Sequence, residues 1–293
     1  RFEEFIKIWP TLKDLAKTTE PKILKFWSGL GYYSRARNLL KAAKIIDKNY
    51  KSEIPNKYED LIILPGIGDY TAKAILGIGY NKSVMPLDAN IERILARLYA
   101  LNKPLIKIKQ KLSKNAQLFL SAKHSSNLIQ SFMDYGSIIC TPRNPNCSIC
   151  GIKKYCLSYQ KKIQNTIPVK VKKTTSKPKK FSRAYILINE KNEIIVRKRA
   201  SKGMLASMLE VPNDDWVEKK SLLRRDVIIN KLQKKLILKG ELNYSFSHFD
   251  LYVEIFYKKI RKIDYPKNKW LNINKYSNSQ LPTVMKKILE III

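Results

Sequence analysis

The chain has 293 residues, enough for two domains with cores of their own, and no run of eighteen apolar residues that would predict a transmembrane helix. Its formal charge of +33 favours a polyanionic partner such as nucleic acid. Only 12 of the 57 basic residues are arginine, and a lysine-biased genome would produce the same excess, so charge alone carries little weight.

A turn followed by aromatic and basic residues occurs early in the chain. Gly29 and Gly31 predict the turn, and a helix is expected to follow it to about Lys48. Two tyrosines and two arginines lie at the start of that helix: Tyr32, Tyr33, Arg35 and Arg37. Tyrosine rings can stack on bases or wedge between them while arginine binds phosphate, so the segment indicates nucleic-acid contact. A core tyrosine pair beside solvated arginines is the alternative.

The strongest signal lies between Leu61 and Leu98. Residues 64–68 (Leu-Pro-Gly-Ile-Gly) predict a tight turn between two helices. Its glycines allow a ligand to approach closely, and the free N–H groups of the turn and of the next helix start suit a phosphate. Asp88 follows twenty residues after Gly68, just before another amphipathic helix. This arrangement indicates work on a nucleic-acid backbone; a plain helix–turn–helix connection and an N-cap role for Asp88 are the alternatives.

Helical periodicity continues through this half of the chain. We expect helices at roughly 57–64, 69–79, 88–99, 108–122 and 126–139, with no strand among them. Residues 1–156 are therefore predicted to form an all-α domain that a cysteine-rich loop closes.

All four cysteines occur within seventeen residues: Cys140, Cys147, Cys150 and Cys156. This clustering indicates one metal centre in a reducing compartment, not a disulfide framework. Four thiolates suit either a structural zinc ion or a cubic iron–sulfur cluster. The spacing favours the cluster modestly, because zinc sites usually have two Cys-x2-Cys pairs. The loop also carries Arg143, which could contact DNA.

The composition changes after the cysteine loop. Residues 157–180 lose helical periodicity and intersperse lysines with Thr, Ser and Pro, which predicts an extended basic linker. Beyond it we expect strands at 184–188 and 193–197, a helix at 218–236, one or two strands over 244–257 and a last helix from about Thr283. Residues 181–293 are therefore predicted to be a smaller α+β domain.

Taken together, these motifs resemble the helix–hairpin–helix DNA glycosylases of the endonuclease III superfamily. The shared features are the hairpin at 64–68, Asp88 and the 6-2-5 spacing of the cysteines. Residues 29–38 and the Phe-Ser-His-Phe segment at 246–249 are similar to the MutY-type branch of adenine DNA glycosylases. The resemblance covers nearly the whole chain and implies a 4Fe–4S cluster at the four cysteines in place of zinc.

The resemblance gives roles to three residues near the hairpin. Asp88 is expected to stabilise the positively charged sugar as adenine leaves, and Asn90 to lie near the sugar and the base. Tyr70 occupies the position where the lyase-competent branch has a lysine, so we expect a monofunctional enzyme without a Schiff-base intermediate. Lys73 is expected to be a solvated lysine, and Ala89 replaces the glycine of the family's Asp-Gly-Asn motif.

The resemblance also implies DNA contacts in both domains. Gly66 and Gly68 are expected to hold a phosphate, and Tyr32 to act as a wedge at the lesion. The second domain is similar to a Nudix fold without its acidic, metal-binding helix. Its Phe246, Ser247 and His248 are expected to touch 8-oxoguanine, because a hydroxyl can report whether ring N7 is a donor or an acceptor. A strand-end serine and a buried histidine are the alternative.

In the family, a glutamate that acts as general acid lies near a Leu-Gln-Gln-Thr stretch upstream of the position matching residue 1. The chain begins with Arg1 instead of Met. We therefore expect an N-terminally truncated sequence, and a chain that binds DNA by itself but excises adenine poorly.

These observations predict a DNA repair glycosylase that removes adenine mispaired with 8-oxoguanine or guanine in double-stranded DNA. We expect a monomer in the cytoplasm of a bacterium, associated with the nucleoid. Three alternatives stay open. One is an endonuclease III-like glycosylase for oxidised pyrimidines, against which Tyr70 and the second domain argue. The second is a DNA-binding, lesion-sensing protein without catalysis. The third is a zinc-bound transcription factor, which would lack the brown colour of an iron–sulfur cluster.

Overall fold

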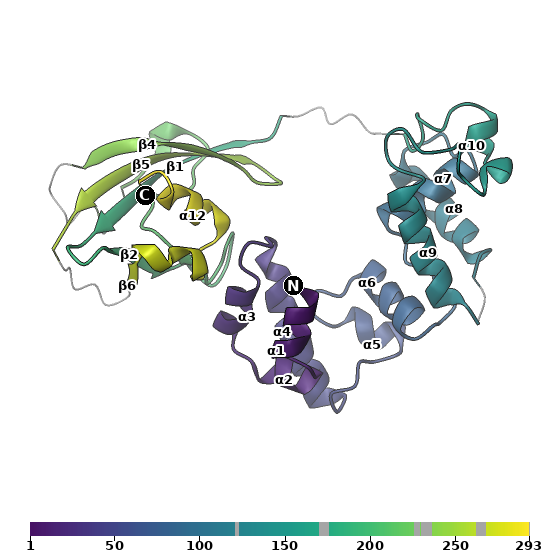
Figure 1. The fold of residues 1–293 in the computed structure, drawn as a ribbon, viewed down its shortest axis with the longest axis horizontal. Coiled ribbons are helices and arrows are strands. Elements are labelled where there is room, and N and C mark those ends of the chain that lie inside the picture. The colour runs from purple at the N-terminus through teal and green to yellow at the C-terminus, as the bar shows by residue number, and fades with distance from the viewer. Residues whose placement is uncertain (121–122, 170–175, 226–228, 230–235, 262–267, 293) are drawn as a thin grey trace. The chain divides into compact units, whose positions relative to one another are not determined.

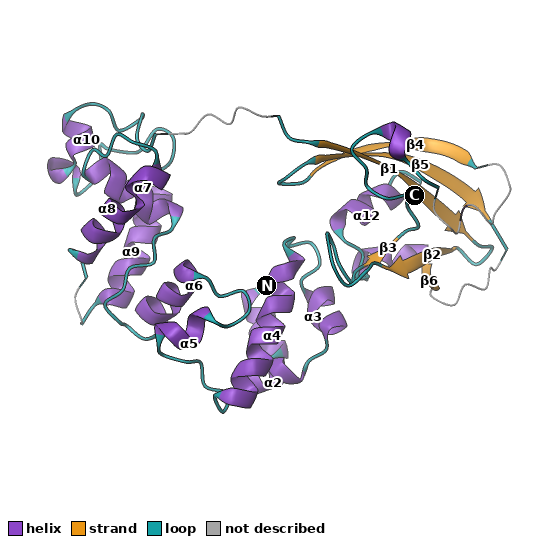
Figure 2. Cartoon of the chain, turned by 180° about the vertical axis from the view of Figure 1, so that it is seen from behind, coloured by secondary structure: helices purple, strands orange, loops and turns teal. Residues whose placement is uncertain are grey.

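A computed structural model describes residues 1–120, 123–169, 176–225, 229, 236–261 and 268–292. Figure 1 shows the order of the helices and strands along the chain. The chain divides into two compact units: the first comprises Arg1–Lys13 and Lys41–Thr174, and the second Asp14–Leu40 and Thr175–Ile293. Figure 2 shows that the first unit is helical and that the described strands lie in the second. Because this division groups residues that lie together and does not test independent folding, the domain boundaries expected near 156 and 181 stay a prediction.

The first unit is built from helices that match most of the predicted ones, with shifted ends. They are α1 (Phe2–Ile8), α5 (Tyr58–Ile62), α6 (Asp69–Ala74), α7 (Ala89–Leu98), α8 (Leu105–Gln117), α9 (Ser125–Ile138) and α10 (Leu157–Gln160). Two further helices, α2 (Leu12–Lys17) and α4 (Tyr33–Asn49), run from one unit into the other. Among the described residues, no helix has both the length and the hydropathy that crossing a membrane requires.

The core of the first unit forms around α7. Ile91 and Leu95 of this helix are fully buried, and they belong to one cluster with Ile108 and Leu112 of α8 and Ile129 of α9. Their spacing of four residues places each pair on one helix face. Burying each such side chain contributes about 1.5–3 kcal/mol. This packing fixes the start of α7, where Asp88 lies.

The predicted helix at 69–79 changes its geometry halfway. Helix α6 ends at Ala74, and the chain continues as a π-helical turn, Ile75–Gly79. A Cβ atom at Gly77 would lie 2.5 Å from Ile129 Cδ1 and 2.6 Å from the Val84 carbonyl oxygen. The close approach of α9 to this turn therefore requires glycine.

Residues 157–169 do not form the extended linker that their composition predicts. Helix α10 starts directly after Cys156, and Ile167 is 1% exposed in the core of the first unit. The carbonyl of Ile167 accepts a hydrogen bond from Arg97 Nε at 2.8 Å. The burial of Ile167 and the hydrogen bond to its carbonyl thus fix a segment whose polar sequence predicts an extended linker. Residues 170–175 lie outside the described residues, and Lys179 already belongs to the first strand.

The second unit contains α3 (Glu20–Phe26) and a mixed sheet. The sheet order is β3-β2-β1-β5-β4, and β6 also pairs with β2. The strands are β1 (Lys179–Ile188), β2 (Glu193–Lys198), β3 (Leu209–Glu210), β4 (Ile237–Ser245), β5 (Asp250–Lys259) and β6 (Asn268–Asn272). β1 and β5 are parallel, with Lys179 opposite Asp250 and Ile188 opposite Lys259, and the other pairs are antiparallel.

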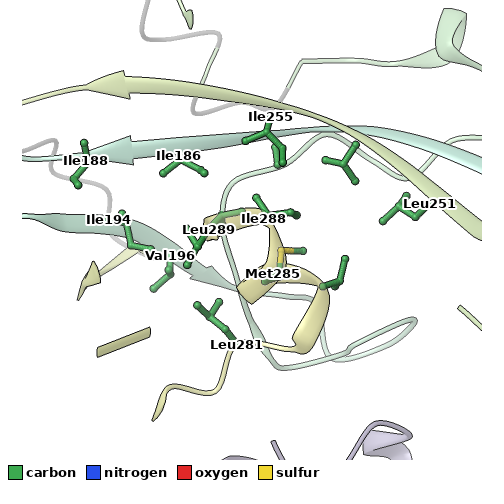
Figure 3. Packing of buried hydrophobic residues seen from close by; sticks show 14 of the residues in the cluster. Ile186, Ile188, Ile194, Val196, Leu251, Ile255, Leu281, Met285, Ile288 and Leu289 are labelled. Carbon is green, nitrogen blue, oxygen red and sulfur yellow. The ribbon is translucent and has the colours of Figure 1, made fainter. Parts of the chain in front are cut away.

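One face of this sheet is covered by α12 (Thr283–Leu289), as Figure 3 shows. Met285 and Ile288 of the helix pack with Ile186, Val196 and Ile255 of the strands. On the opposite face, a second cluster contains Tyr185, Leu187, Ile195, Ile229 and Phe256. Side chains alternate between the two faces of a strand, so β1 is buried from Ala184 to Ile188 on both sides.

The sequence located β1, β2 and β5. Most of β4, which begins at Ile237, lies before the strand region expected at 244–257, and strands β3 and β6 were missed. β3 has only two residues, and β6 has the polar sequence Asn-Lys-Trp-Leu-Asn, so neither shows an alternating pattern of useful length. The helix expected over 218–236 is contradicted at its start, where residues 218–225 hold only a 3-10 turn at Lys220–Leu222. Ile229 is helical, and residues 226–228 and 230–235 lie outside the described residues.

Candidate functional site

Asp88 lies at the start of α7 beside the other predicted catalytic residues. Its Oδ1 accepts a hydrogen bond from the Ile91 N–H at 2.7 Å, and its Oδ2 accepts one from the Asn90 amide at 3.1 Å. The first bond makes Asp88 the N-cap of the helix, a role worth about 1 kcal/mol. Capping and catalysis are compatible, because the cap holds the carboxylate in place. Ala89 is an ordinary helical residue, so its methyl group causes no backbone strain.

Tyr70 shares the electrostatic environment of Asp88. Partial burial, followed by the charge of Asp88, raises the pKa of Tyr70. The pKa of Glu92, one helical turn after Asp88, is also raised by burial and by Asp88, while Lys109 acts in the opposite direction. Burial and the charge of Asp88 therefore both disfavour a further negative charge at these two side chains.

Arg93 connects this group to the first cysteine. The side chain is buried in α7, and its Nη2 donates to Asn90 Oδ1 at 2.9 Å and to the Gly136 carbonyl at 2.6 Å. Its Nε donates to the Cys140 carbonyl at 2.7 Å. Because one guanidinium binds both Asn90 and the cysteine loop, the loop helps to orient Asn90 and, through it, Asp88.

Gly136 of α9 allows this close packing. A Cβ atom at Gly136 would lie 2.6 Å from Asn90 Cβ and 3.2 Å from Asn90 Cα. Any larger residue would push against the first turn of α7. Gly136 is therefore required by its neighbour and not by its own backbone conformation.

The glycine hairpin lies in the same unit, directly before α6. Gly66 has a φ of +82°, the left-handed region that favours glycine, whereas Gly68 is extended, with φ −98°. A Cβ atom at Gly68 would meet nothing within 4 Å, so this position is open to a ligand. Of these two positions, only Gly66 therefore needs glycine for its backbone conformation.

Lys73 is not the freely solvated lysine that was expected. Its Nζ lies 2.8 Å from Asp69 Oδ1, and its side chain is 31% exposed. The hydroxyl of Tyr58 donates to the same oxygen at 3.0 Å. The hydrogen bond from Lys73 is the main cause of the lowered pKa of Asp69. Lys73 therefore neutralises an acid next to the hairpin.

The four cysteines are free thiols that line a single cavity. Burial raises the pKa of Cys147 and of Cys156, and the other three cysteines add to the effect at Cys147. Thiols grouped in this way ionise readily only when a metal centre takes up their charge. Four thiols that line one cavity fit a metal centre held by four cysteine ligands, the ligand set of a 4Fe–4S cluster.

Two side chains donate to the cysteine sulfurs. Arg97, 2% exposed on α7, donates from Nη1 to Cys140 Sγ at 3.3 Å and to the Thr141 carbonyl at 2.7 Å. The hydroxyl of Tyr135 donates to Cys150 Sγ at 3.3 Å. Burial, with this bond as the second cause, raises the pKa of Tyr135. Arg143 is exposed on the cysteine loop, where DNA could reach it.

In the second unit, the Phe-Ser-His-Phe segment is the tight turn between β4 and β5. The N–H of Phe246 donates to the Phe249 carbonyl at 2.9 Å, which closes the turn. Both phenylalanine rings pack on Trp216, with ring centres 5.5 and 6.0 Å away. Ser247 and His248 are exposed at the tip. The alternative of a buried histidine is therefore wrong, and the aromatic anchors present two polar side chains to solvent.

Tyr32 meets this turn within the same unit. Its ring is 65% exposed, and its hydroxyl lies 2.9 Å from Ser247 Oγ. Both residues line a cavity of about 490 Å³ that Arg37 and His248 also reach. Arg35 is exposed. Arg37 Nε pairs with Glu20 at 3.2 Å, while its Nη2 is buried without a hydrogen-bond partner.

Only one of the two tyrosines after the glycine turn is available for binding. Tyr33 is 6% exposed, so the core alternative holds for Tyr33 but fails for Tyr32.

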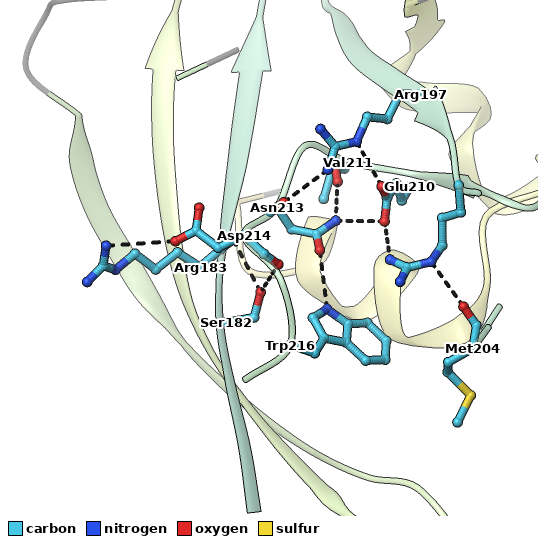
Figure 4. A network of polar contacts seen from close by, with 10 residues as sticks. Ser182, Arg183, Arg197, Met204, Glu210, Val211, Asn213, Asp214 and Trp216 are labelled. Carbon is cyan, nitrogen blue, oxygen red and sulfur yellow. Dashed lines mark hydrogen bonds and ion pairs between the residues drawn. The ribbon is translucent and has the colours of Figure 1, made fainter. Parts of the chain in front are cut away.

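A polar network holds Trp216 in place (Figure 4). Trp216 Nε1 donates to Asn213 Oδ1 at 3.2 Å, and Asn213 Nδ2 donates to Glu210 Oε2 at 2.8 Å. Glu210, 4% exposed, also pairs with Arg197 Nε at 2.8 Å and with Arg199. The buried acid is thus fully satisfied, and the network fixes the ring on which the turn rests.

Sequence reasoning missed Arg93, Arg97, Tyr135 and Gly136. The two arginines lie four residues apart on the apolar face of α7, and a charge at a core position is a signal of a buried partner. Tyr135 and Gly136 show no local pattern, because their partners are distant in sequence.

Comparisons with known proteins agree with this arrangement. A model described as "HhH-GPD superfamily base excision DNA repair protein" matches residues 1–117. The iron–sulfur binding domain of endonuclease III matches 140–156, and a NUDIX domain matches 183–291. A solved thermostable thymine-DNA glycosylase is 27% identical, covers 55% of this chain and 75% of its own, and has a TM-score of 0.50.

Curated relatives cover almost the whole chain. The adenine DNA glycosylase of Buchnera aphidicola subsp. Baizongia pistaciae is 34% identical over 98% of this chain and 82% of its own length. That of subsp. Schizaphis graminum is 32% identical over 99% of this chain and 85% of its own length. The chain therefore belongs to the adenine DNA glycosylase family, and it is a DNA-binding base-excision repair glycosylase that hydrolyses N-glycosyl bonds and carries a 4Fe–4S cluster.

Proposed function

We propose that this glycosylase removes adenine paired with 8-oxoguanine or guanine in double-stranded DNA, and that Asp88 carries the chemistry. The observation on which the proposal rests is the carboxylate of Asp88, which two hydrogen bonds hold at the start of α7. The target adenine must leave the base stack to reach it.

Cleavage of the glycosidic bond leaves positive charge on the sugar. A carboxylate facing that sugar stabilises the charge electrostatically or by a transient covalent bond, as in glycosidases. An ionised carboxylate offers about four acceptor sites. Ile91 and Asn90 occupy one site on each oxygen of Asp88, which leaves acceptor capacity for the substrate. Asn90, oriented by Arg93, keeps the carboxylate in position.

Tyr70 supports hydrolysis without a covalent amine intermediate. A phenol beside Asp88 cannot form a Schiff base, and the amine of Lys73 is engaged with Asp69. We therefore expect borohydride to trap no adduct on abasic DNA.

Several predicted contacts would hold the DNA. Gly66 and Gly68 offer an open hairpin to a phosphate, and the exposed Arg35 and Arg143 offer cations. The exposed ring of Tyr32 is suited to wedge between bases. The four cysteines would hold the cluster, which ties the loop carrying Arg143 to α7 and α9 through Arg97 and Tyr135.

The turn at 246–249 is suited to recognise the damaged base. 8-Oxoguanine has an N7–H donor where guanine has an N7 acceptor. A Ser247 hydroxyl that donates its own hydrogen to Tyr32 would be left as an acceptor, which favours the N7–H of 8-oxoguanine over guanine. Ser247 is exposed and already bonded to the wedge residue Tyr32, so both would contact the lesion together.

We also infer a monomer that acts at the bacterial chromosome in the cytoplasm. The two Buchnera relatives support a bacterial setting.

The test of lesion recognition is the double variant Ser247→Ala, His248→Ala. The readout is the ratio of affinities for duplexes that place a non-cleavable adenine analogue opposite 8-oxoguanine or guanine. Loss of one or two hydrogen bonds of about 1 kcal/mol each should lower this ratio roughly 5- to 30-fold. Asn243→Ala, an exposed change on the same strand β4, is the control and should keep the ratio. An unchanged ratio in the double variant would contradict the proposal.

A further inference from the structure

Tyr135 has no part in the chemistry at Asp88, yet it contacts the cysteine cavity directly. The residue lies in the last turn of α9, and its hydroxyl is 3.3 Å from Cys150 Sγ. Its side chain lines the same cavity as the four cysteines. A Cβ atom built on Gly151 would lie 3.9 Å from the hydroxyl oxygen, so the phenol ends at the backbone of the loop that follows Cys150.

The direction of the hydrogen bond follows from the chemistry of the ligand. A cysteine that binds iron is a thiolate and can only accept, so the hydrogen of the phenol must point at the sulfur. Arg97 supplies the equivalent donor to Cys140 Sγ, also at 3.3 Å. Two cysteine sulfurs therefore each receive one donor, one from a cation on α7 and one from a neutral hydroxyl on α9.

Hydrogen bonds to the sulfurs of an iron–sulfur cluster are one of the factors that set its reduction potential. A donor removes electron density from the thiolate and stabilises the more electron-rich state of the cluster. We propose that Tyr135 tunes the 4Fe–4S cluster through its bond to Cys150, raising the reduction potential and protecting the cluster against oxidation. The inference depends on ligation by Cys150 and is independent of the lesion that the enzyme recognises.

The variant Tyr135→Phe tests the hydroxyl alone, because it keeps the ring. Tyr159→Phe is the matched control: Tyr159 lines the same cavity, and among the described residues its hydroxyl makes no hydrogen bond to a cysteine sulfur. Iron and sulfide per chain are measured first in the purified holoproteins, then the reduction potential by protein-film voltammetry. We expect full cluster content in both variants, a more negative potential in Tyr135→Phe, and the wild-type potential in Tyr159→Phe.

A second readout follows the Fe–S(Cys) stretching band by resonance Raman spectroscopy, together with the rate at which ferricyanide bleaches the visible absorbance. Tyr135→Phe should shift the band and bleach several-fold faster than wild type and Tyr159→Phe. A wild-type potential in Tyr135→Phe, or equal shifts in both variants, would overturn the proposal. Loss of the cluster from Tyr135→Phe alone would assign the hydroxyl to cluster assembly and would also overturn tuning.

Discussion

Asp88 is the N-cap of α7 and also the carboxylate proposed for the chemistry. As N-cap it satisfies an N–H group at the start of α7, and that bond limits the positions its carboxylate can take. The spacing from the hairpin singled out Asp88, and the family resemblance pointed to Asn90 and Tyr70; their catalytic roles stay predictions. The sequence could not reveal Arg93 or Gly136, because each is defined by a partner more than forty residues away.

Gly136→Ala should slow adenine release about 100-fold, because displacement of a catalytic group by 1 Å can cost that much. The added methyl group would lie 2.6 Å from Asn90 Cβ and must push the first turn of α7, with Asp88, away from its position. Overpacking should also lower the free energy of unfolding by about 1–3 kcal/mol. Single-turnover rates and denaturant unfolding measure the two effects.

The neighbouring Ser137→Ala is the matched control, because Ser137 is exposed on α9 and its change adds no bulk. Wild-type adenine release from Gly136→Ala would show that α7 tolerates the shift and would refute the positioning role.

At the scale of elements, the β4–β5 hairpin depends on contacts outside its own strands. Trp216 supports its phenylalanines, and Lys177 Nζ donates to Ser245 Oγ at 2.9 Å and to the Phe246 carbonyl at 3.0 Å. The sequence predicted one or two strands over 244–257 from the alternating aromatic and β-branched residues, but not the hairpin or the start of β4 at Ile237. It indicated nothing of Lys177, which appeared as one lysine of a basic linker.

Lys177→Ala should weaken the preference for 8-oxoguanine over guanine about threefold to tenfold, because a charged donor to the turn is worth about 1 kcal/mol when partly exposed. Lys177→Arg should retain most of the preference. Lys179→Ala removes a similar charge two residues away, near Tyr252 and off the turn, and should have no effect. Binding isotherms on the duplexes that carry 8-oxoguanine or guanine opposite the adenine analogue measure this preference. If the Lys177 and Lys179 variants lost the same share of the preference for 8-oxoguanine, the preference would depend on overall positive charge and not on the hydrogen bonds of Lys177 to the turn.

The outer face of the sheet carries an ion-pair group with a defined pH dependence. The pKa of Glu254 is lowered mainly by Lys220, whose Nζ lies 2.9 Å from the carboxylate. Arg183, with Nε 3.5 Å from the carboxylate, lowers it further. A lowered pKa means that the stabilisation is complete above the ordinary glutamate pKa of about 4.3 and is lost as pH falls through the lowered value.

Glu254→Gln should therefore lower the free energy of unfolding by less than about 1 kcal/mol at pH 7, as for a largely exposed pair. The difference from wild type should shrink as pH falls below the ordinary glutamate pKa of about 4.3, because the Glu254 carboxyl becomes protonated. Urea unfolding at a series of pH values from 7 downward measures it. A difference that grows toward low pH would contradict the assignment.

At the scale of the whole molecule, the sequence predicted an all-α part, a cysteine loop and an α+β part, and the family comparisons confirm this organisation. Long periodic helices and a dense cysteine motif could be predicted because their signals lie within one short stretch of sequence and do not depend on distant contacts. The segment 157–169 and strand β6 were missed because the residues that bury them come from elsewhere in the chain. The adenine-specific relatives also leave no support for the oxidised-pyrimidine alternative.

The measurement that tests the role of Asp88 most directly is binding to charged sugar analogues. Two duplexes are compared, each with a sugar analogue opposite 8-oxoguanine in place of the adenosine. The analogue is a cationic pyrrolidine in one duplex and a neutral tetrahydrofuran in the other. Wild type should prefer the cation, and Asp88→Asn, which preserves the N-cap, should lose that preference by about 10- to 100-fold while its affinity for the neutral duplex stays the same. If Asp88→Asn kept the full preference for the cation, the carboxylate would not face the sugar and the account of catalysis would be wrong.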